Sequence, residues 1–76
     1  TMEYSLNSKI KDIIANESLR TQINEVAPGL VDHPQINRVK IFSLKACSKI
    51  IPKQLNAEVL AKIEDIFEKE NQKNKS

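Results

Sequence analysis

The chain has few of the residues from which metal and redox sites are built. Its 76 residues include one cysteine, one histidine and no tryptophan. A single cysteine excludes an internal disulfide bond, and together with a single histidine it leaves too few soft ligands for a structural zinc site. The sequence therefore predicts no metal site and no bound cofactor, and it gives no sign of an oxidising compartment. We expect a cytoplasmic protein.

Glycine and proline are also rare, and most of them fall in one short stretch. Residues 27–34 contain the only glycine and two of the three prolines. Proline cannot continue a helix, and glycine accepts the positive φ that a helix end often needs. We therefore expect Pro28 and Gly29 to form a structural corner that ends a helix, and not a ligand-binding loop.

The sequence shows no pattern of strands or membrane spans. No segment alternates apolar and polar residues between hairpin turns, and there is no second glycine to make such turns. No apolar run approaches the roughly 18 residues that cross a bilayer, and the first residues lack a basic region followed by an apolar stretch. The pattern predicts an all-α domain without membrane contact.

What the chain does contain is a series of short apolar stripes at helical spacing. These stripes fall within residues 6–14, 19–27, 36–40, 44–51 and 57–67. The expected N-caps of the first, second, fourth and fifth helices are Asn7 or Ser5, Asn16, Ser43 and Asn56. Pro34 suits the first position of the third helix.

These segments predict a compact orthogonal bundle of four to five short helices over residues 4–67. Residues 68–76 contain no apolar side chain, so we expect a charged tail that is frayed or disordered. The predicted core consists of the residues on the inner faces of the stripes: Leu19, Ile23, Val26, Leu30, Leu44, Cys47, Ile51, Leu60, Ile63 and Phe67.

The side chains that could carry out chemistry all have plainer interpretations. His33 lies in a turn, where its ring is expected to cap a backbone group or to meet solvent, because there is no nucleophile to pair with it. Cys47 lies on an apolar stripe, which predicts an inert core thiol. Ser43 and Ser48 lack a base. The sequence therefore predicts no catalytic residues and a protein that is not an enzyme.

The charges are unevenly distributed along the chain, although the net charge is only +2. The segment between His33 and Asn56 contains no acidic residue and five basic ones: Arg38, Lys40, Lys45, Lys49 and Lys53. They form either a solvated lysine face, which we favour, or a binding site for an anionic partner. A DNA-binding helix-turn-helix is disfavoured, because its recognition helix would present carboxylates to phosphates.

A set of turn and cap residues gives the chain one resemblance. The set comprises Tyr4-Ser5-Leu6, Ile10, Ile13-Ile14, Pro28-Gly29-Leu30, His33-Pro34, Ser43-Leu44, Leu55 and Leu60. Over residues 4–67 it resembles a small helical module appended to some bacterial carbohydrate-active enzymes and esterases. The chain departs from that module at Ile41, where the module has glycine, and in its lysine content. The resemblance implies an accessory role and supplies no functional residue.

Two functions therefore remain open. The favoured one is a non-enzymatic accessory or protein-interaction domain whose partner is another protein or an adjoining domain. The alternative is a small nucleic-acid or acidic-partner binding domain that uses the basic segment 38–53. With one tyrosine and two phenylalanines, the chain has too few aromatic side chains for a platform that stacks single-stranded bases.

Overall fold

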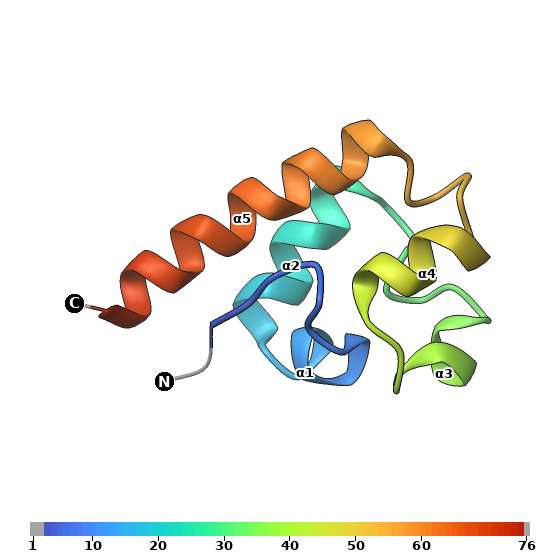
Figure 1. Cartoon of the computed structure of the whole chain (residues 1–76), viewed down its shortest axis with the longest axis horizontal. Coiled ribbons are helices and arrows are strands. Elements are labelled where there is room, and N and C mark those ends of the chain that lie inside the picture. Colours follow the sequence, from blue (N-terminus) through green and yellow to red (C-terminus); the bar gives the residue numbers. More distant parts are fainter. Residues whose placement is uncertain (1–2, 76) are drawn as a thin grey trace.

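The computed structural model describes residues 3–75, which fold into five helices, as Figure 1 shows. The helices are α1 (Ile10–Ile14), α2 (Glu17–Val26), α3 (Ile36–Val39), α4 (Leu44–Ile50) and α5 (Ala57–Lys75). The described residues form no strand, only one isolated antiparallel bridge between Lys9 and Ser43. The predicted all-α bundle is confirmed.

Three of the predicted N-caps hold their helices in the expected way. Asn16 Oδ1 accepts a hydrogen bond from Leu19 N (3.1 Å), and Ser43 Oγ accepts one from Ala46 N (3.2 Å). Asn56 Oδ1 accepts one from the N–H of Val59 (2.9 Å). Each side chain satisfies a backbone donor that has no partner within its own helix, which explains why α2, α4 and α5 begin where they do.

The corner at residues 27–34 is built as the sequence predicts. Gly29 has a φ of 84°, and its N–H donates to Asn24 Oδ1 (3.2 Å). Leu30 is buried, so the turn is packed onto the core. His33 Nδ1 accepts a hydrogen bond from Gln35 N (3.1 Å), which confirms the capping role expected of that ring. The third helix starts at Ile36, two residues later than Pro34 suggested.

The core is wider than the predicted one and includes residues from all five helices. Eight of the ten predicted members are buried, whereas Val26 and Leu60 are only partly buried. Seven further buried residues were not predicted: Ile10, Ile13, Ala27, Ile36, Val39, Leu55 and Ile66. Most of these come from α1, α3 and the chain beside them. The shortest helices therefore contribute as fully to the core as the long ones do.

The prediction for the C-terminal residues needs correction. Residues 68–75 are not a disordered tail, because α5 continues without a break to Lys75; residue 76 lies outside the described residues. Glu70 is buried. Asn71 Oδ1 accepts a hydrogen bond from Tyr4 N, and Asn71 Nδ2 donates one to Tyr4 O. Polar contacts hold this part of the helix, which apolar periodicity could not reveal. No helix among the described residues is both long and apolar enough to span a bilayer.

Candidate interaction surface

The predicted N-cap of α1 is wrong, because neither Ser5 nor Asn7 caps this helix. The helix begins at Ile10 after Lys9, whose side chain makes no cap hydrogen bond. Carbonyls from the segment before α4 cap the helix instead, since Ile10 N donates to Phe42 O and Lys11 N donates to Lys40 O, both at 3.0 Å.

The same arrangement operates in the opposite direction at the start of α4. Leu44 N donates to Ser8 O (3.1 Å), and Lys45 N donates to Leu6 O (2.9 Å). The segments leading into α1 and α4 thus run antiparallel and cap each other's first turn through the backbone, around the bridge between Lys9 and Ser43. This reciprocal capping fixes the backbone of residues 40–45.

Ile41 and Phe42 stand on this fixed backbone and point outward. Ile41 is 65% exposed and Phe42 is 45% exposed, although both are large apolar residues. The carbonyl of Phe42 is engaged with α1, and its N–H donates to Val39 O (2.9 Å). The two side chains are therefore held in solvent by a rigid connection, and they do not belong to a loose loop that could fold back onto the core.

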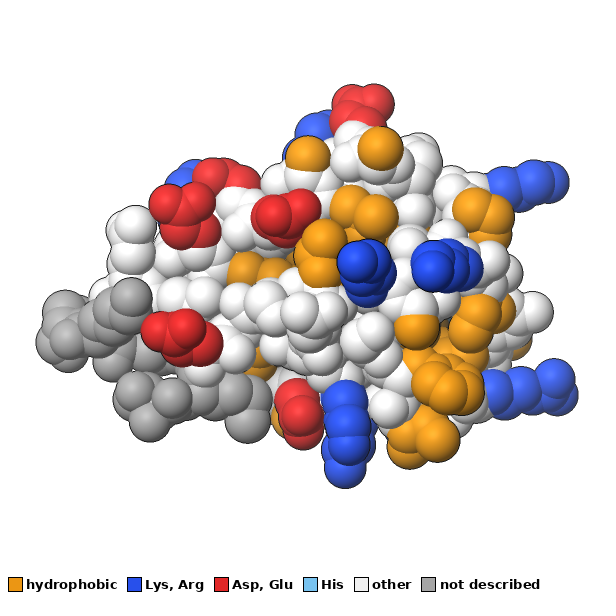
Figure 2. All heavy atoms as spheres, viewed as in Figure 1, with side chains coloured by type: hydrophobic (Ala, Val, Ile, Leu, Met, Phe, Trp, Pro, Cys, Tyr) orange, Lys and Arg blue, Asp and Glu red, His pale blue; other side chains and the backbone are white. Residues whose placement is uncertain are grey.

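A third large apolar residue, Ile50, lies at the end of α4 and is 47% exposed. Ala46 and Ile50 are four residues apart and share one side of α4, whereas Phe42 precedes the helix and its extended N-cap, Ser43. Lys45 and Lys49 lie one turn apart on the adjoining exposed side. Figure 2 shows hydrophobic side chains gathered over α3 and α4 with lysine or arginine side chains beside them. We use the name α4 surface for five exposed residues: Ile41, Phe42, Lys45, Lys49 and Ile50.

The structure brings together only some of the five predicted basic residues. Lys45 and Lys49 share the exposed side of α4, and Lys53 adjoins Ile50 in a hollow of about 320 Å³ that also includes His33 and Pro52. Arg38 is exposed on α3, and Lys40 is half-buried just before Ile41.

None of these five basic residues forms an ion pair with a carboxylate of the described chain. Lys62 pairs with Glu58 and Lys69 with Asp65, and both of these ion pairs lie on α5. The positive charge near α4 is therefore left for solvent or for another molecule.

The groups that could have carried out chemistry are in inert settings. Cys47 is fully buried, its Sγ lies 3.8 Å from the Val39 carbonyl oxygen, and desolvation raises the pKa of the thiol. A protonated buried thiol is a poor nucleophile. Ser48 Oγ donates to Lys45 O (2.6 Å), as serine in a helix often does. No group of three or more His, Cys, Asp or Glu side chains in the described residues is placed to hold a metal ion.

A hollow of about 630 Å³ lies between the N-terminal segment and α5. Tyr4, Leu6 and Phe67 contribute apolar surface to it, and its remaining lining includes the carboxylates of Glu64, Asp65 and others. It contains no histidine, cysteine or basic side chain. The hydroxyl of Ser5 therefore has no histidine beside it to act as a base, and the lining offers no positive charge for an anionic substrate.

No family model, no curated protein and no solved structure matches the chain.

Sequence reasoning finds the lysines of the α4 surface but misses its apolar members. In the sequence, Ile41 is notable only because the accessory module that the chain resembles has glycine there. Ile50 lies beside the apolar stripe of residues 44–51, which predicts burial. One signal is available, because Ile41 and Phe42 are adjacent large apolar residues directly before a helix cap and fit neither neighbouring stripe. The reciprocal capping that holds them has no signature in the side chains.

Proposed function

We propose that this chain is a non-enzymatic protein-interaction domain that contacts its partner through the α4 surface. The observation that carries the proposal is the combination of three exposed large apolar side chains with unpaired lysines on one rigid helix and its entry segment. No other large apolar side chain of the described residues is exposed.

A small domain has few large apolar side chains to bury, so those that it leaves exposed are informative. A chain of this size buries only about 60% of the surface that its unfolded form exposes, so large apolar side chains are valuable in the core. Ile41, Phe42 and Ile50 contribute little to that core, yet the backbone presents them in fixed positions. Clustered apolar side chains with a polar rim are typical of protein interfaces.

The weak resemblance to an accessory module of bacterial enzymes supports the same proposal, since such a module would act by contact and not by chemistry. A cytoplasmic location is also part of the proposal, because the one cysteine is a buried free thiol and no disulfide is needed to stabilise the domain. The partner is accordingly another protein or an adjoining domain.

A second candidate function, nucleic-acid binding, is favoured by one observation only. Five basic residues near α3 and α4 lack an ion-pair partner within the described chain. Phosphate binding would not need Ile41 or Ile50, and a single exposed aromatic ring gives little surface for base stacking. We therefore rank it below protein binding.

Site-specific cross-linking in the cells that produce the chain tests the proposed function. A photoreactive amino acid replaces Ile41 in one variant and Thr21, which is exposed on α2, in the matched control. We expect a discrete protein adduct from position 41 and none from position 21. Adducts at neither position, or equal adducts at both, contradict a protein-binding role of the α4 surface.

Titration with duplex and single-stranded nucleic acid at two salt concentrations tests the second candidate. Electrostatic binding would weaken steeply with salt, with a slope of about 0.9 per phosphate neutralised on a duplex. The variant Lys45→Gln/Lys49→Gln would lose that binding, and Lys62→Gln/Lys69→Gln on α5 is the control with the same change in charge. Tight, salt-sensitive binding that only the first variant loses would favour nucleic acid over protein.

A further inference from the structure

We propose that the α4 surface binds a second copy of this chain in a two-fold symmetric dimer. This inference rests on the proposed function and specifies its partner, because the other protein molecule is then the chain itself. In the dimer, the two lysines of each α4 surface face Glu64 and Glu68 of the other copy. The apolar side chains of each α4 surface cover the hollow between the N-terminal segment and α5 of the other copy.

Two carboxylates of α5 line that hollow without an ion-pair partner. Glu64 and Glu68 are exposed, and neither pairs with a cation within the described chain. They are four residues apart within α5, so they share one side of the helix. We call them the acidic pair. The carboxylates of Glu58 and Asp65, by contrast, are already paired with lysines of α5 itself.

The lysines of the α4 surface have the same spacing with the opposite charge. Lys45 and Lys49 are exposed, lie four residues apart within α4 and form no ion pair in the described chain. We call them the lysine pair. Four residues of helix correspond to a rise of about 6 Å, so the two pairs have the same separation along their helices. When α4 of one copy lies beside α5 of another, both lysines can therefore face both carboxylates.

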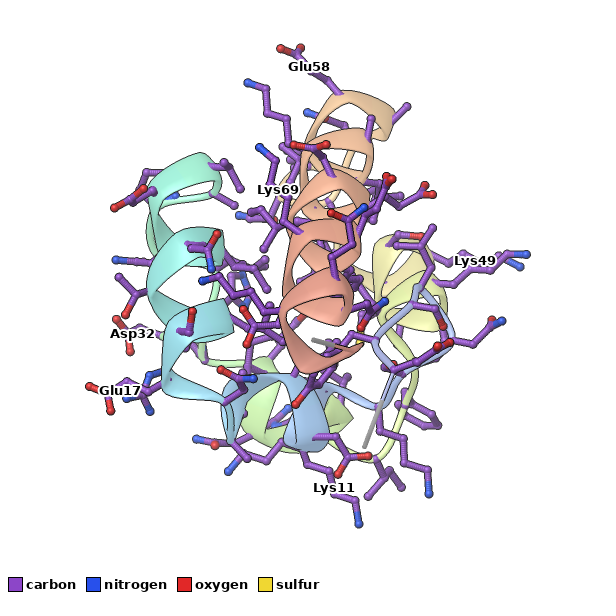
Figure 3. All side chains as sticks on the ribbon, turned by 90° about the vertical axis from the view of Figure 1, so that its left-hand side faces the viewer. Lys11, Glu17, Asp32, Lys49, Glu58 and Lys69 are labelled. Carbon is purple, nitrogen blue, oxygen red and sulfur yellow. The ribbon has the colours of Figure 1, made fainter. Side chains whose placement is uncertain are left out.

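The acidic pair and the lysine pair lie on one face of the molecule. Lys45 N donates to Leu6 O (2.9 Å), and Leu6 lines the hollow, so the start of α4 adjoins its rim. Figure 2 shows acidic side chains over α5 and lysine or arginine side chains over α4, with hydrophobic side chains between them. Figure 3 views the molecule from the left of Figure 1 and shows Lys49 projecting toward that same face, away from Glu17 and Asp32.

Neighbouring patches of opposite charge make this face complementary to a copy of itself. A two-fold axis between the patches places the acidic pair of each copy against the lysine pair of the other. Both contacts then form together, and the assembly closes as a dimer. A different protein would have to present both charges in the matching arrangement, whereas a second copy does so by symmetry. Charge complementarity therefore favours a second copy.

The hollow beside the acidic pair provides apolar surface for the same contact. It has a volume of about 630 Å³, and Tyr4 and Leu6 in its lining are only half-buried. Ile41 and Phe42 are exposed on the segment that leads into α4, next to the lysine pair. Apolar contacts contribute most of the affinity of an interface, while complementary charges direct its orientation. Docking by the lysine pair thus brings apolar side chains to an apolar hollow.

Sedimentation equilibrium of the full chain tests the dimer, and charge reversal assigns it to this face. We expect the fraction of dimer to rise between about 10 µM and about 1 mM chain and to fall as salt is added. Lys45→Glu/Lys49→Glu sets carboxylates against the acidic pair and should weaken the dimer at least about tenfold. Glu64→Lys/Glu68→Lys should weaken it similarly, because lysines then face the lysine pair.

An equimolar mixture of these two variants should dimerise again, since each contact then joins opposite charges. The matched control replaces the first variant in the mixture with Lys62→Glu/Lys69→Glu, which changes the net charge equally but keeps the lysine pair. One contact of that mixture still joins like charges, so it should dimerise at least about tenfold more weakly. Equal dimerisation of the two mixtures would show only general attraction between oppositely charged proteins and would overturn the proposed contact.

A pair of uncharged variants tests the hollow separately. Ala61 and Ala57 are both exposed on α5, but only Ala61 lines the hollow. Ala61→Gln should obstruct the hollow and weaken the dimer, whereas Ala57→Gln should leave it unchanged. Equal effects of the two substitutions would contradict a role of the hollow. Thermal unfolding of each variant confirms that it is folded at the temperature of the measurement.

Failure of the dimer and failure of the proposed function give different results. A chain that stays monomeric up to about 1 mM overturns the dimer, and so does a dimer that survives both charge reversals. Adducts from the photoreactive residue at position 41 with twice the mass of the chain support it. Adducts at that position with a different protein only would overturn the second copy and leave the proposed function intact. Absence of any adduct there contradicts the proposed function itself.

Discussion

The α2–α5 end and the α4 end of the molecule differ in how their polar and apolar side chains are placed. Where α2, α5 and the N-terminal segment meet, polar side chains are paired with one another. Asn16 Nδ2 donates to Tyr4 Oη and to Glu70 Oε2, both at 3.2 Å, and Ser18 Oγ donates to Glu70 Oε1 at 3.4 Å. Near α4, by contrast, three large apolar side chains and two lysines are left in solvent.

The polar contacts at the α2–α5 end stabilise the fold, whereas we propose that the α4 end serves binding. Glu70 is only 8% exposed and lies beside the start of α2, where a carboxylate suits the helix dipole. Tyr4 adds a ring contact with Phe67, with centroids 6.0 Å apart. No buried side-chain nitrogen or oxygen of the described residues lacks a hydrogen-bond partner. The polar side chains of the α2–α5 end are thus satisfied within the chain, whereas the α4 end leaves Ile41, Phe42 and Ile50 exposed.

The largest expected effect comes from removing a buried side chain at the α2–α5 end. Ile63 is fully buried on α5, so Ile63→Ala should lower the free energy of unfolding by about 2–5 kcal/mol. That is a large part of the roughly 4–11 kcal/mol expected for a domain of this length. Urea unfolding followed by circular dichroism measures it. A loss below about 1 kcal/mol would show that the core near α5 is loosely packed.

The second effect concerns the buried carboxylate. Glu70→Ala removes the acceptor of both Asn16 and Ser18 and should cost about 1–3 kcal/mol in unfolding free energy. Glu68→Ala, an exposed neighbour on the same helix, is the control and should change stability by less than about 0.5 kcal/mol. Equal losses in the two variants would mean that the polar cluster contributes no stability and that the comparison of the two ends is wrong.

The sequence predicts correctly those features that depend on neighbouring residues. Caps such as Asn16, Ser43 and Asn56 act within one turn of their own helix, so the local pattern predicts them correctly. Corner chemistry at Gly29 is equally local. The all-α class follows from the same short-range signals.

Local sequence patterns could not predict the tertiary contacts between distant segments. Glu70 and Asn71 look like part of a solvated tail until Asn16 and Tyr4 are placed beside them, 54 and 67 residues away along the chain. The predicted start of α1 is wrong for the same reason, because its cap comes from backbone carbonyls of residues 40 and 42 and not from a side chain. The exposure of Ile41 and Phe42 depends on this backbone pairing, so composition alone could reveal only the lysines.

A third, smaller effect tests the corner between the two ends. Gly29 has a φ of 84°, and a Cβ built there meets no atom within 4 Å. Gly29→Ala should therefore cost about 1 kcal/mol from backbone strain alone, without any clash. Gly29→Asn should cost less, because asparagine tolerates the left-handed region better. Thermal melts of the two variants compare these losses, and an unchanged melting temperature for Gly29→Ala would show that the turn relaxes to negative φ.

The smallest effect is expected from the α4 surface, and it is the sharpest test of the comparison. Ile41→Ser/Phe42→Ser removes two side chains that are 65% and 45% exposed, so the free energy of unfolding should change by less than about 1 kcal/mol. The backbone hydrogen bonds from Ile10 and to Val39 do not need those side chains and should persist, as amide hydrogen exchange can show. The same variant should lose the partner. If it instead unfolds as readily as Ile63→Ala, then Ile41 and Phe42 serve the fold, and the α4 surface is not set aside for binding.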